Sequence, residues 1–262
     1  MNETAIIIPA RYGSSRLKGK PLIRVYDKPI IQWVFENAVK SNFADRVIIA
    51  TDNEDIYNEA MLFGAEVEMT SDAHRSGSDR IAEVVERHPE ISHIVNLQGD
   101  EPLITSESID LVIKDVRDND EADISTLIRV LKDKKDIDGP NCVKCVVDNN
   151  GFALYFSRSK IPYERNEGYA KIYGHLGIYG YTRDALLKMT QMEQSTLELA
   201  ESLEQLRALQ AGMRIKTSVV DFTPVGIDTA SDVEKFKKIL EKELPSGEEF
   251  ENDDENDEGI SF

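Results

Sequence analysis

Residues 5–22 read AIIIPARYGSSRLKGKPL, an apolar run that opens directly onto a loop rich in glycine, serine and cations. From residue 4 to residue 26 the chain has five Arg and Lys residues and no Asp or Glu, although its formal net charge is -18. Backbone N–H groups, hydroxyls and cations together can bind the oxygens of a polyphosphate. The stretch therefore predicts a buried strand followed by a phosphate-binding loop, and the alternative is a basic surface loop.

Short apolar runs alternate with helical patterns through the first half of the chain. The expected elements are strands at 5–9, 46–50, 65–69 and 93–97, and helices at 29–41, 53–63 and 79–87. This alternation predicts a mostly parallel, Rossmann-like α/β sheet with helices on both faces. Thr51-Asp52-Asn53-Glu54 is typical of a capping box that opens the second helix. Ligands of such sheets bind beyond the carboxyl ends of the strands, where the basic loop lies.

The middle of the chain has a different pattern. Apolar runs at 143–148 and 152–157 flank Asn149-Asn150-Gly151, which is a strong hairpin signal, and a third run follows at 175–181. We expect these strands to form an inserted antiparallel region, at about 140–181, within a single α/β domain of residues 1–244. The chain then returns to a helix (197–210), a strand (215–220) and a last helix (230–242).

Composition sets further limits on function. Residues 246–262 contain eight acids and no bases, so we expect residues 245–262 to be a disordered acidic tail. The acidity of the whole chain argues against nucleic acid or an anionic membrane as partner. The chain has neither a signal-peptide pattern nor a segment of roughly 18 apolar residues. These features favour a soluble, cytoplasmic protein with a small anionic ligand.

Cys142 and Cys145, the only two cysteines, form a Cys-x-x-Cys pattern. Such a pair can be a redox centre or half of a zinc site. Here the surrounding residues are β-branched, and side chains three apart on a strand point to opposite faces. We therefore interpret both cysteines as small buried apolar residues.

Two acidic segments could hold a metal ion. Residues 96–102, NLQGDEP, follow a strand with Asp100 and Glu101, and a carboxylate beside bound phosphates can hold Mg²⁺. Gly99 would leave room for a ligand, although an ordinary turn has the same composition. Asp228 precedes the last helix, where a simple N-cap is the default interpretation. It would complete a magnesium site only if the fold brings it to Asp100.

Other segments carry polar side chains that could contact a ligand. His175 and Tyr179 fall on one face of their strand, where they could hydrogen-bond a polyhydroxylated ligand or simply belong to a half-buried strand. Arg158 follows an apolar run and could pair with a carboxylate. Residues 74–80 could contact a base or phosphate, or only cap a helix. Glu204 and Gln205 belong to an amphipathic helix, whose polar face is ordinarily solvated.

Taken together, these segments resemble the 3-deoxy-manno-octulosonate cytidylyltransferase family. The resemblance extends to about residue 240 and is carried by IPARY (8–12), GKPL (19–22), ATD (50–52), SG (76–77), DR (79–80), NLQGDEP (96–102), ALYFSR (153–158), HLGIYGY (175–181), LEQLR (203–207) and IDT (227–229). The N-terminal signature is shared with other sugar nucleotidyltransferases. The YFSR and HLGIY segments are far more specific to this family.

The resemblance implies a role for each matching residue. Arg11, Ser14 and Lys20 would hold the phosphates of CTP, and Ser76, Gly77 and Arg80 would contact the cytidine. Asp100 and Asp228 would bind Mg²⁺ and form the catalytic set with Lys20. The sugar-acid pocket would be lined by Gln98, Arg158, His175, Tyr179, Glu204 and Gln205. The acidic tail departs from the family's usual ending, and no role is carried over to it.

The implied fold is of the nucleotide-diphospho-sugar transferase type, with a homodimer paired through the inserted strands. The implied reaction transfers CMP from CTP to the anomeric hydroxyl of 3-deoxy-D-manno-octulosonate (Kdo), giving CMP-Kdo and pyrophosphate for lipopolysaccharide biosynthesis. The alternative acceptors are 8-amino-Kdo and a nonulosonate such as sialic acid. An alternative of another class is a non-catalytic nucleotide-binding regulatory protein, which would be expected to lack the two metal-binding acids.

Overall fold

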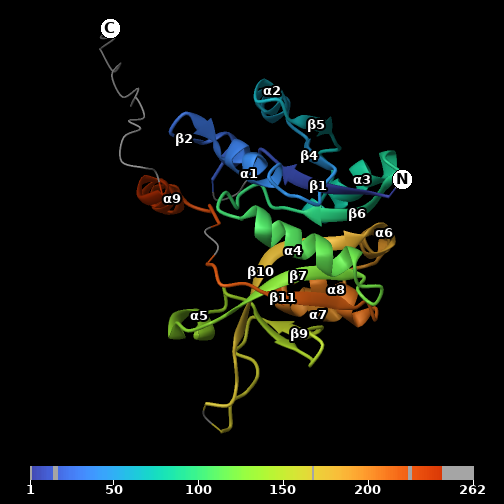
Figure 1. Cartoon of the computed structure of the whole chain (residues 1–262), viewed down its shortest axis with the longest axis vertical. Helices are drawn as coiled ribbons and strands as arrows, with labels where there is room; N and C mark the ends of the chain where they lie inside the picture. Colours follow the sequence, from blue (N-terminus) through green and yellow to red (C-terminus); the bar gives the residue numbers. More distant parts are fainter. Residues whose placement is uncertain (1, 14–16, 167, 224–225, 244–262) are drawn as a thin grey trace.

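The computed structural model describes residues 2–13, 17–166, 168–223 and 226–243, and within these residues a nine-stranded sheet forms the centre of the molecule (Figure 1). The seven strands of its main path are β1 (Glu3–Ala10), β4 (Arg46–Thr51), β5 (Glu66–Met69), β6 (Ile91–Asn96), β7 (Ile124–Val130), β10 (Tyr173–Thr182) and β11 (Ile215–Val219). They lie in the order β11-β7-β10-β6-β1-β4-β5. Every neighbouring pair is parallel except those of β10, which runs antiparallel to both β6 and β7. The predicted mostly parallel sheet is confirmed.

Helices cover both faces of this sheet. One face is covered by α1 (Ile30–Ala38), α2 (Glu54–Leu62) and α4 (Ser106–Arg117). The other is covered by α3 (Gly77–Arg87), α6 (Arg183–Gln191), α7 (Thr196–Glu201) and α8 (Gln205–Gln210). Alternation along β1 supplies both cores, because Ile6 and Ile8 pack on the first layer while Ala5 and Ile7 pack on the second. The last helix, α9 (Ala230–Glu243), packs against α1.

The predicted hairpin is confirmed and extends the sheet beside β10. Its strands are β8 (Lys144–Val147) and β9 (Ala153–Ser157), and β8 also pairs with β10. The turn closes because the Asp148 carboxylate accepts from the backbone N–H groups of Asn150 and Phe152, and Gly151 has a φ of 78°. The chain after β9 projects away from the body as a long arm before it returns into β10 (Figure 1).

β10 is irregular in the middle. Leu176 pairs with Leu127, but the next residue of β7, Thr126, pairs with Tyr179. Two extra residues of β10 therefore bulge out, and the Thr126 hydroxyl lies within hydrogen-bonding distance of the carbonyls of Leu176 and Ile178. Because the insertion is two residues long, the side chains of β10 keep their alternation.

The structure corrects two sequence predictions. The single helix expected at 197–210 is two short helices, because Ser202 ends α7 with a φ of 52°. The second helix is capped by Asn53, whose side chain accepts from Ile56 N, and Thr51 does not form the expected capping box. The sequence patterns also did not predict α4, β7, α6, the short α5 (Lys134–Asp138), the 3-10 turn η1 (Lys20–Leu22) or the ribbon of β2 (Arg24–Val25) and β3 (Lys28–Pro29).

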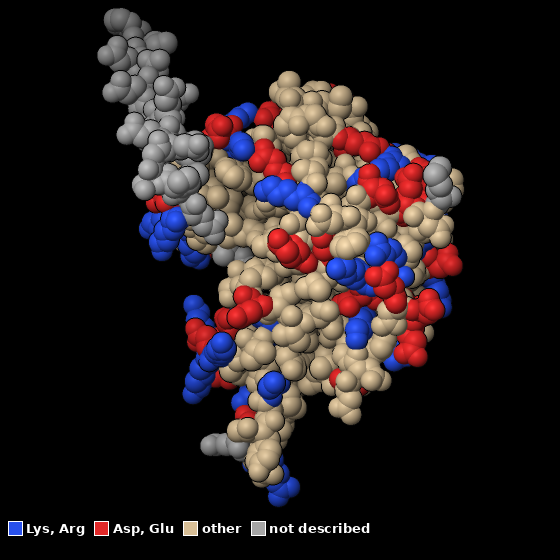
Figure 2. Space-filling model, in the orientation of Figure 1, with Lys and Arg blue, Asp and Glu red and all other residues tan. Residues whose placement is uncertain are grey.

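The remaining expectations concern composition. Both cysteines are free thiols, Cys145 buried in β8 and Cys142 half-buried just before it. Among the described residues, no helix combines the length and apolarity needed to cross a bilayer. Basic and acidic side chains are interspersed on the face seen in Figure 2. The predicted acidic tail lies outside the described residues.

Candidate active site

A cavity of about 240 Å³ lies at the carboxyl ends of β1 and β6. It is lined by Pro9, Arg11, Lys20, Pro21, His74, Arg75, Ser76, Gly77, Arg80, Gln98, Gly99, Asp100 and Asp228. Of the residues expected to bind nucleotide or metal, all that the structure describes line this one cavity. Ser14 lies outside the described residues. The residues predicted at the strand ends therefore share one cavity, which both cations and carboxylates line.

Lys20 joins the two carboxylates of the predicted metal site. Its ammonium donates to Asp100 Oδ2 at 2.5 Å and to Asp228 Oδ1 at 3.1 Å. Asp228 reaches this position because the backbone N–H of Ile227 donates to the carbonyl of Asp100 at 2.9 Å. Gly19 starts the turn that presents Lys20, with a φ of 67° that favours glycine. The fold thus brings the three expected catalytic residues together.

A third carboxylate stands beside this group. Burial, together with the charges of Asp100 and Asp228, raises the pKa of Glu101 to about 7 against the opposing effect of Lys20. Three acids beside the one ammonium of Lys20 leave this group of residues with more acidic than basic side chains, which favours an added cation. Glu101 appears in the sequence beside Asp100 but was not among the predicted site residues.

Gly77 and Gly99 keep the backbone segments of the site close together. A Cβ on Gly77 would lie 3.2 Å from Cγ of Pro9, and one on Gly99 would lie 3.2 Å from both Ile31 Cδ1 and the Pro9 carbonyl oxygen. Gly99 lines the cavity. Its tight packing against Ile31 and Pro9 is by itself a reason for glycine at this position, whether or not a ligand approaches it.

The loop that enters α3 forms one wall of the cavity. Ser76 caps the helix in a capping box with Asp79. Arg80 is almost fully buried (3% exposed), and its guanidinium donates to Asp52 Oδ2 at 2.6 Å and contacts the hydroxyl of Thr70. Arg80 thus holds α3 against the ends of β4 and β5, and its expected contact with cytidine remains a prediction.

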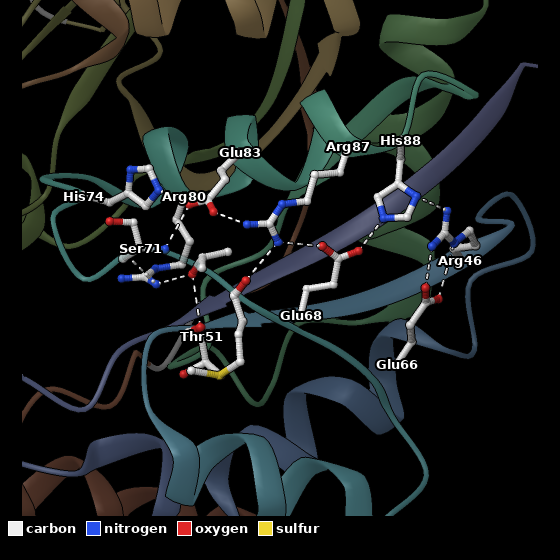
Figure 3. Close-up of polar contacts among 12 residues, drawn as sticks. Arg46, Thr51, Glu66, Glu68, Ser71, His74, Arg80, Glu83, Arg87 and His88 are labelled. Carbon is white, nitrogen blue, oxygen red and sulfur yellow. Dashed lines mark hydrogen bonds and ion pairs between the residues drawn. The ribbon is translucent and has the colours of Figure 1, made fainter.

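A chain of ion pairs continues along this edge (Figure 3). Glu83 accepts from Ser71 N at 2.9 Å and contacts both His74 and Arg87, which in turn donates to Glu68. His74 lines the cavity, so Glu83 fixes the loop that precedes Ser76. This network of ion pairs could not be predicted from the sequence, because its residues come from three separate elements.

Of the residues expected to bind the sugar acid, Gln98 lines the cavity itself, whereas Arg158, His175, Tyr179, Glu204 and Gln205 do not. His175 lies between Phe156 and Tyr179, with ring centroids 5.1 and 5.2 Å apart, on the predicted common face of β10. Its Nε2 is 3.0 Å from the hydroxyl of Thr126. Burial raises the pKa of Tyr179 well above its ordinary value, so this side chain stays a neutral phenol.

Glu204 and Gln205 carry polar atoms without partners. Ser78 donates to Glu204 Oε2 at 3.1 Å, whereas Glu204 Oε1 and Gln205 Nε2 are buried with no hydrogen-bond partner in the described part of the chain. Burial also raises the pKa of Glu204. Gln205 is only 6% exposed, so the predicted alternative of a solvated helix face is wrong for it. Unpaired buried polar atoms are costly, so these two atoms are available to hydrogen-bond a ligand.

Arg158 is held by main-chain oxygens. Its guanidinium donates to the carbonyls of Glu201, Pro140 and Ser202 at 2.7, 3.0 and 3.3 Å. The remaining N–H groups could still bind a carboxylate, which remains a prediction. Arg75 and Ser76 line the first cavity and also a neighbouring cavity of about 620 Å³ that Glu204 lines. Glu204 therefore lies next to the residues expected to bind nucleotide.

The imidazole of His175, a half-buried residue enclosed by Phe156 and Tyr179, gives a testable pH effect. Burial lowers its pKa from 6.5 to about 3. We expect its ring resonances, followed by NMR, to stay constant between pH 5 and pH 8. Since the unfolded chain binds this proton more strongly, the free energy of unfolding should fall as the pH drops below 6.5, by up to about 1.4 kcal/mol per pH unit. A native titration midpoint near 6.5 would contradict the burial of His175.

Comparison with known proteins identifies the family. A sequence profile described as Cytidylyltransferase matches residues 5–215. The 3-deoxy-manno-octulosonate cytidylyltransferase of Fusobacterium nucleatum is 46% identical over 236 residues, covering 90% of this chain and 96% of that protein. The protein of the same name from Escherichia coli is 41% identical over 244 residues, covering 93% and 98%. The chain belongs to the 3-deoxy-manno-octulosonate cytidylyltransferase family.

Solved structures agree with this placement. A CMP:2-keto-3-deoxy-manno-octonic acid synthetase complexed with CTP matches with a TM-score of 0.89 and 40% identity, covering 93% of this chain and all of that one. A cytidylyltransferase from Leptospira borgpetersenii is similar in fold alone, with a TM-score of 0.65 at 18% identity. The sequence resemblance is confirmed.

The cavity of this cytidylyltransferase also fits the expected cofactor. Mg²⁺ is bound by one or two carboxylates plus substrate phosphates, and no larger all-protein cage is needed. Asp100 and Asp228 converge on a single cation, the ammonium of Lys20, at hydrogen-bonding distance. The described residues contain no group of three or more His, Cys, Asp or Glu arranged as metal ligands. The donor set therefore suits a magnesium ion that arrives with a nucleotide.

Proposed function

We propose that this protein transfers CMP from CTP to the anomeric hydroxyl of Kdo, releasing pyrophosphate. The observation that carries the proposal is the meeting of Lys20 with Asp100 and Asp228 in the cavity beside the loop that caps α3. A relative with 40% identity bears the name of a CMP-Kdo synthetase and is complexed with CTP. The non-catalytic alternative has no such support, because both expected metal-binding acids are present and face each other.

In the proposed reaction, the anomeric oxygen of Kdo forms a bond to the α-phosphorus of CTP. The bond from that phosphorus to the bridging oxygen breaks, pyrophosphate takes the electron pair, and the hydroxyl proton passes to solvent water. Lys20 and Arg11 would bind the phosphates and neutralise the charge of the leaving group. Because the step needs no covalent enzyme intermediate, catalysis consists of positioning and charge neutralisation.

We assign Asp100 and Asp228 to hold Mg²⁺. When bound, the ion would supply further neutralisation of phosphate charge. Lys20 would then release one or both carboxylates and turn to the pyrophosphate, which is possible because its ammonium is already in the cavity. Glu101, whose pKa burial raises to about 7, would ionise more readily beside the added cation.

For the acceptor, we assign Tyr179, Glu204 and Gln205 to the sugar hydroxyls, with His175, Gln98 and Arg158 nearby. Glu204 Oε1 and Gln205 Nε2, which are buried without partners in the described part of the chain, supply an acceptor and a donor for such hydroxyls. 8-Amino-Kdo, which differs from Kdo by an amine in place of one hydroxyl, is the alternative acceptor that differs least in its polar groups.

The test is pyrophosphate release from the purified protein with CTP and Mg²⁺, with Kdo, 8-amino-Kdo and sialic acid supplied in parallel. We expect release with Kdo at a kcat/KM at least about tenfold above either competitor, since one mismatched polar contact costs about that much or more. Release with 8-amino-Kdo alone would reassign the acceptor. Binding of CTP without release on any acceptor would support the non-catalytic alternative.

We also propose a homodimer. Tyr163 and Tyr169 on the projecting arm are each 89% exposed, and Leu154 on β9 is 61% exposed, on a strand whose ladder partner is β8. Exposed tyrosines on a protruding segment are typical of interfaces.

Sedimentation equilibrium should therefore give about twice the 29.5 kDa chain mass. The double variant Tyr163→Ser/Tyr169→Ser should shift the protein toward monomers while its thermal stability changes little, because neither side chain is buried in the monomer. A wild-type monomer, or a double variant that remains fully dimeric, would rule out this interface.

We propose that the protein acts in the cytoplasm and that its product serves lipopolysaccharide biosynthesis. The location is supported by the two free thiols, since cytoplasmic thiols are kept reduced. The pathway follows from the resemblance and from the sugar that names the relatives.

A further inference from the structure

Lys144 is an unusual residue for the interior of a sheet. It lies on β8, exposes none of its surface (0%), and donates from its ammonium to the carbonyls of Gly139 at 2.8 Å, Cys142 at 2.7 Å and Arg158 at 2.5 Å. Burial lowers its pKa. Taking an ammonium out of water is costly, and an apolar residue of the same size at such a place is often as stable or more so. Stability alone therefore gives no reason for a lysine here.

The three carbonyls that Lys144 binds connect it to Arg158 in two ways. One is the carbonyl of Arg158 itself. The other two, on Gly139 and Cys142, bracket Pro140, whose carbonyl accepts from Arg158 Nη1 at 3.0 Å. Lys144 thus fixes both the backbone of Arg158 and the loop that holds its guanidinium.

Arg158 in turn fixes the break between α7 and α8. Its Nε donates to the carbonyl of Glu201 and its Nη2 to that of Ser202, while Glu201 Oε2 accepts from Arg158 N at 2.9 Å. Ser202 has a φ of 52°, a left-handed conformation that is unfavourable for serine and persists only where its surroundings hold it. Two residues later the chain reaches Glu204, the start of α8.

The position of this break decides where Glu204 and Gln205 point. These residues carry the buried Oε1 and Nε2 atoms that have no partner in the described part of the chain. A shift of their helix by a fraction of an ångström would move both atoms relative to a bound sugar. The nucleotide cavity does not include Lys144, Arg158, Glu204 or Gln205 among its lining residues.

We propose that Lys144 is a positioning residue for the acceptor half of the site, acting through Arg158 and the α7–α8 break on Glu204 and Gln205. The proposal rests on the proposed function, because the acceptor is the sugar acid of that reaction. Lys144 itself touches no substrate. The proposal predicts that loss of the Lys144 ammonium changes the KM for Kdo and not the KM for CTP.

The test is Lys144→Met, which keeps the length of the side chain and removes the ammonium. We expect the KM for Kdo to rise about 10- to 100-fold, while the KM for CTP stays within about twofold. The matched control is Lys216→Met, on β11, because the Lys216 ammonium also donates to a main-chain carbonyl, that of Asn150, but far from the α7–α8 break. It should leave both KM values unchanged.

Glu201→Gln provides a second variant in case Lys144→Met does not fold. Glu201 accepts from Ser157 Oγ at 2.7 Å as well as from Arg158 N, so the amide weakens the same connection from the other side. A selective rise in the KM for Kdo is again expected. An unchanged KM for Kdo in the folded variant, or equal rises for both substrates, would overturn the proposal.

Amide hydrogen exchange separates this proposal from the proposed function. Lys144→Met should speed exchange in peptides covering 139–142 and 201–205, and should leave 70–76 beside the nucleotide cavity unchanged. If wild-type protein shows no turnover with Kdo, the proposed function fails, and the exchange result still decides the positioning role. Unchanged exchange at 201–205 would overturn it.

Discussion

Replacing Asp100 by asparagine should lower kcat at least about 100-fold, because the loss of one carboxylate from a magnesium site removes about 3 kcal/mol or more of charge stabilisation. Asparagine keeps the shape of the side chain, so the fold and the cavity should survive. The apparent affinity for Mg²⁺ should fall in parallel. Steady-state rates measured across a magnesium titration, with CTP and Kdo saturating, give both quantities.

The matched control for this prediction is Asp120→Asn, an exposed aspartate in the turn before β7. It should change neither kcat nor the magnesium dependence. Turnover of Asp100→Asn at the wild-type rate, with the wild-type magnesium dependence, would remove Asp100 from the mechanism. Asp228→Asn should have an effect in the same direction, since both carboxylates contact Lys20.

Replacing Arg207 by alanine should lower the free energy of unfolding by about 3–5 kcal/mol, which corresponds to about 6–20 °C in Tm for a domain of this size. Arg207 donates from Nε and Nη2 to the two oxygens of Glu198, at 2.8 and 2.6 Å, and both side chains are about nine-tenths buried. Its Nη1 also donates to the carbonyl of Met189. The variant leaves the Glu198 carboxylate buried without its cation. Thermal and urea unfolding measure the loss.

Two comparisons make this prediction specific. Lys237→Ala, which breaks an exposed pair with Glu234, should cost well under about 1 kcal/mol. The double variant Glu198→Leu/Arg207→Met should recover part of the loss, because no unpaired charge is then buried. A loss from Arg207→Ala as small as that of the control would show that the buried pair does not support the α6–α8 region.

The ion pair between Glu198 and Arg207 also makes the free energy of unfolding depend on pH. Burial opposes ionisation of Glu198, but its hydrogen bonds from Arg207 and the backbone of Ser195 lower its pKa overall. A carboxyl whose pKa is lowered by folding stabilises the folded protein above its ordinary pKa of 4.5, and this contribution is lost as the pH falls through the folded value. The stability gap between wild type and Arg207→Ala should therefore narrow below pH 4.5.

Local patterns in the sequence were sufficient for much of the fold. The strands around residues 5–9, 46–50 and 93–97 were predictable because their apolar runs are short and clearly bounded. The helix α4 was missed although Ile109, Val112, Ile113 and Val116 stand at helical spacing behind a Thr105 cap. The break at Ser202 could not be predicted, because the side chain that holds it, Arg158, is 44 residues away.

In the candidate site, too, some residues were predictable from local motifs and others depend on partners far away in the sequence. Asp100 and Lys20 were recognisable from motifs, but their meeting with Asp228 depends on a single backbone hydrogen bond from Ile227, more than a hundred residues along the chain. Arg80 and Lys144 are ordinary surface residue types by composition. Their burial depends on partners, Asp52 for Arg80 and three carbonyls for Lys144, that only the folded chain brings together.

The most direct test of the central claim is identification of the product formed from CTP, Mg²⁺ and Kdo. Mass spectrometry and ³¹P NMR of the reaction mixture should show a phosphodiester of CMP with Kdo and one pyrophosphate for each CTP consumed. Free CMP with pyrophosphate, and no sugar phosphodiester at any time point, would show hydrolysis of CTP in place of transfer. That result would contradict the assignment of Tyr179, Glu204 and Gln205 to an acceptor.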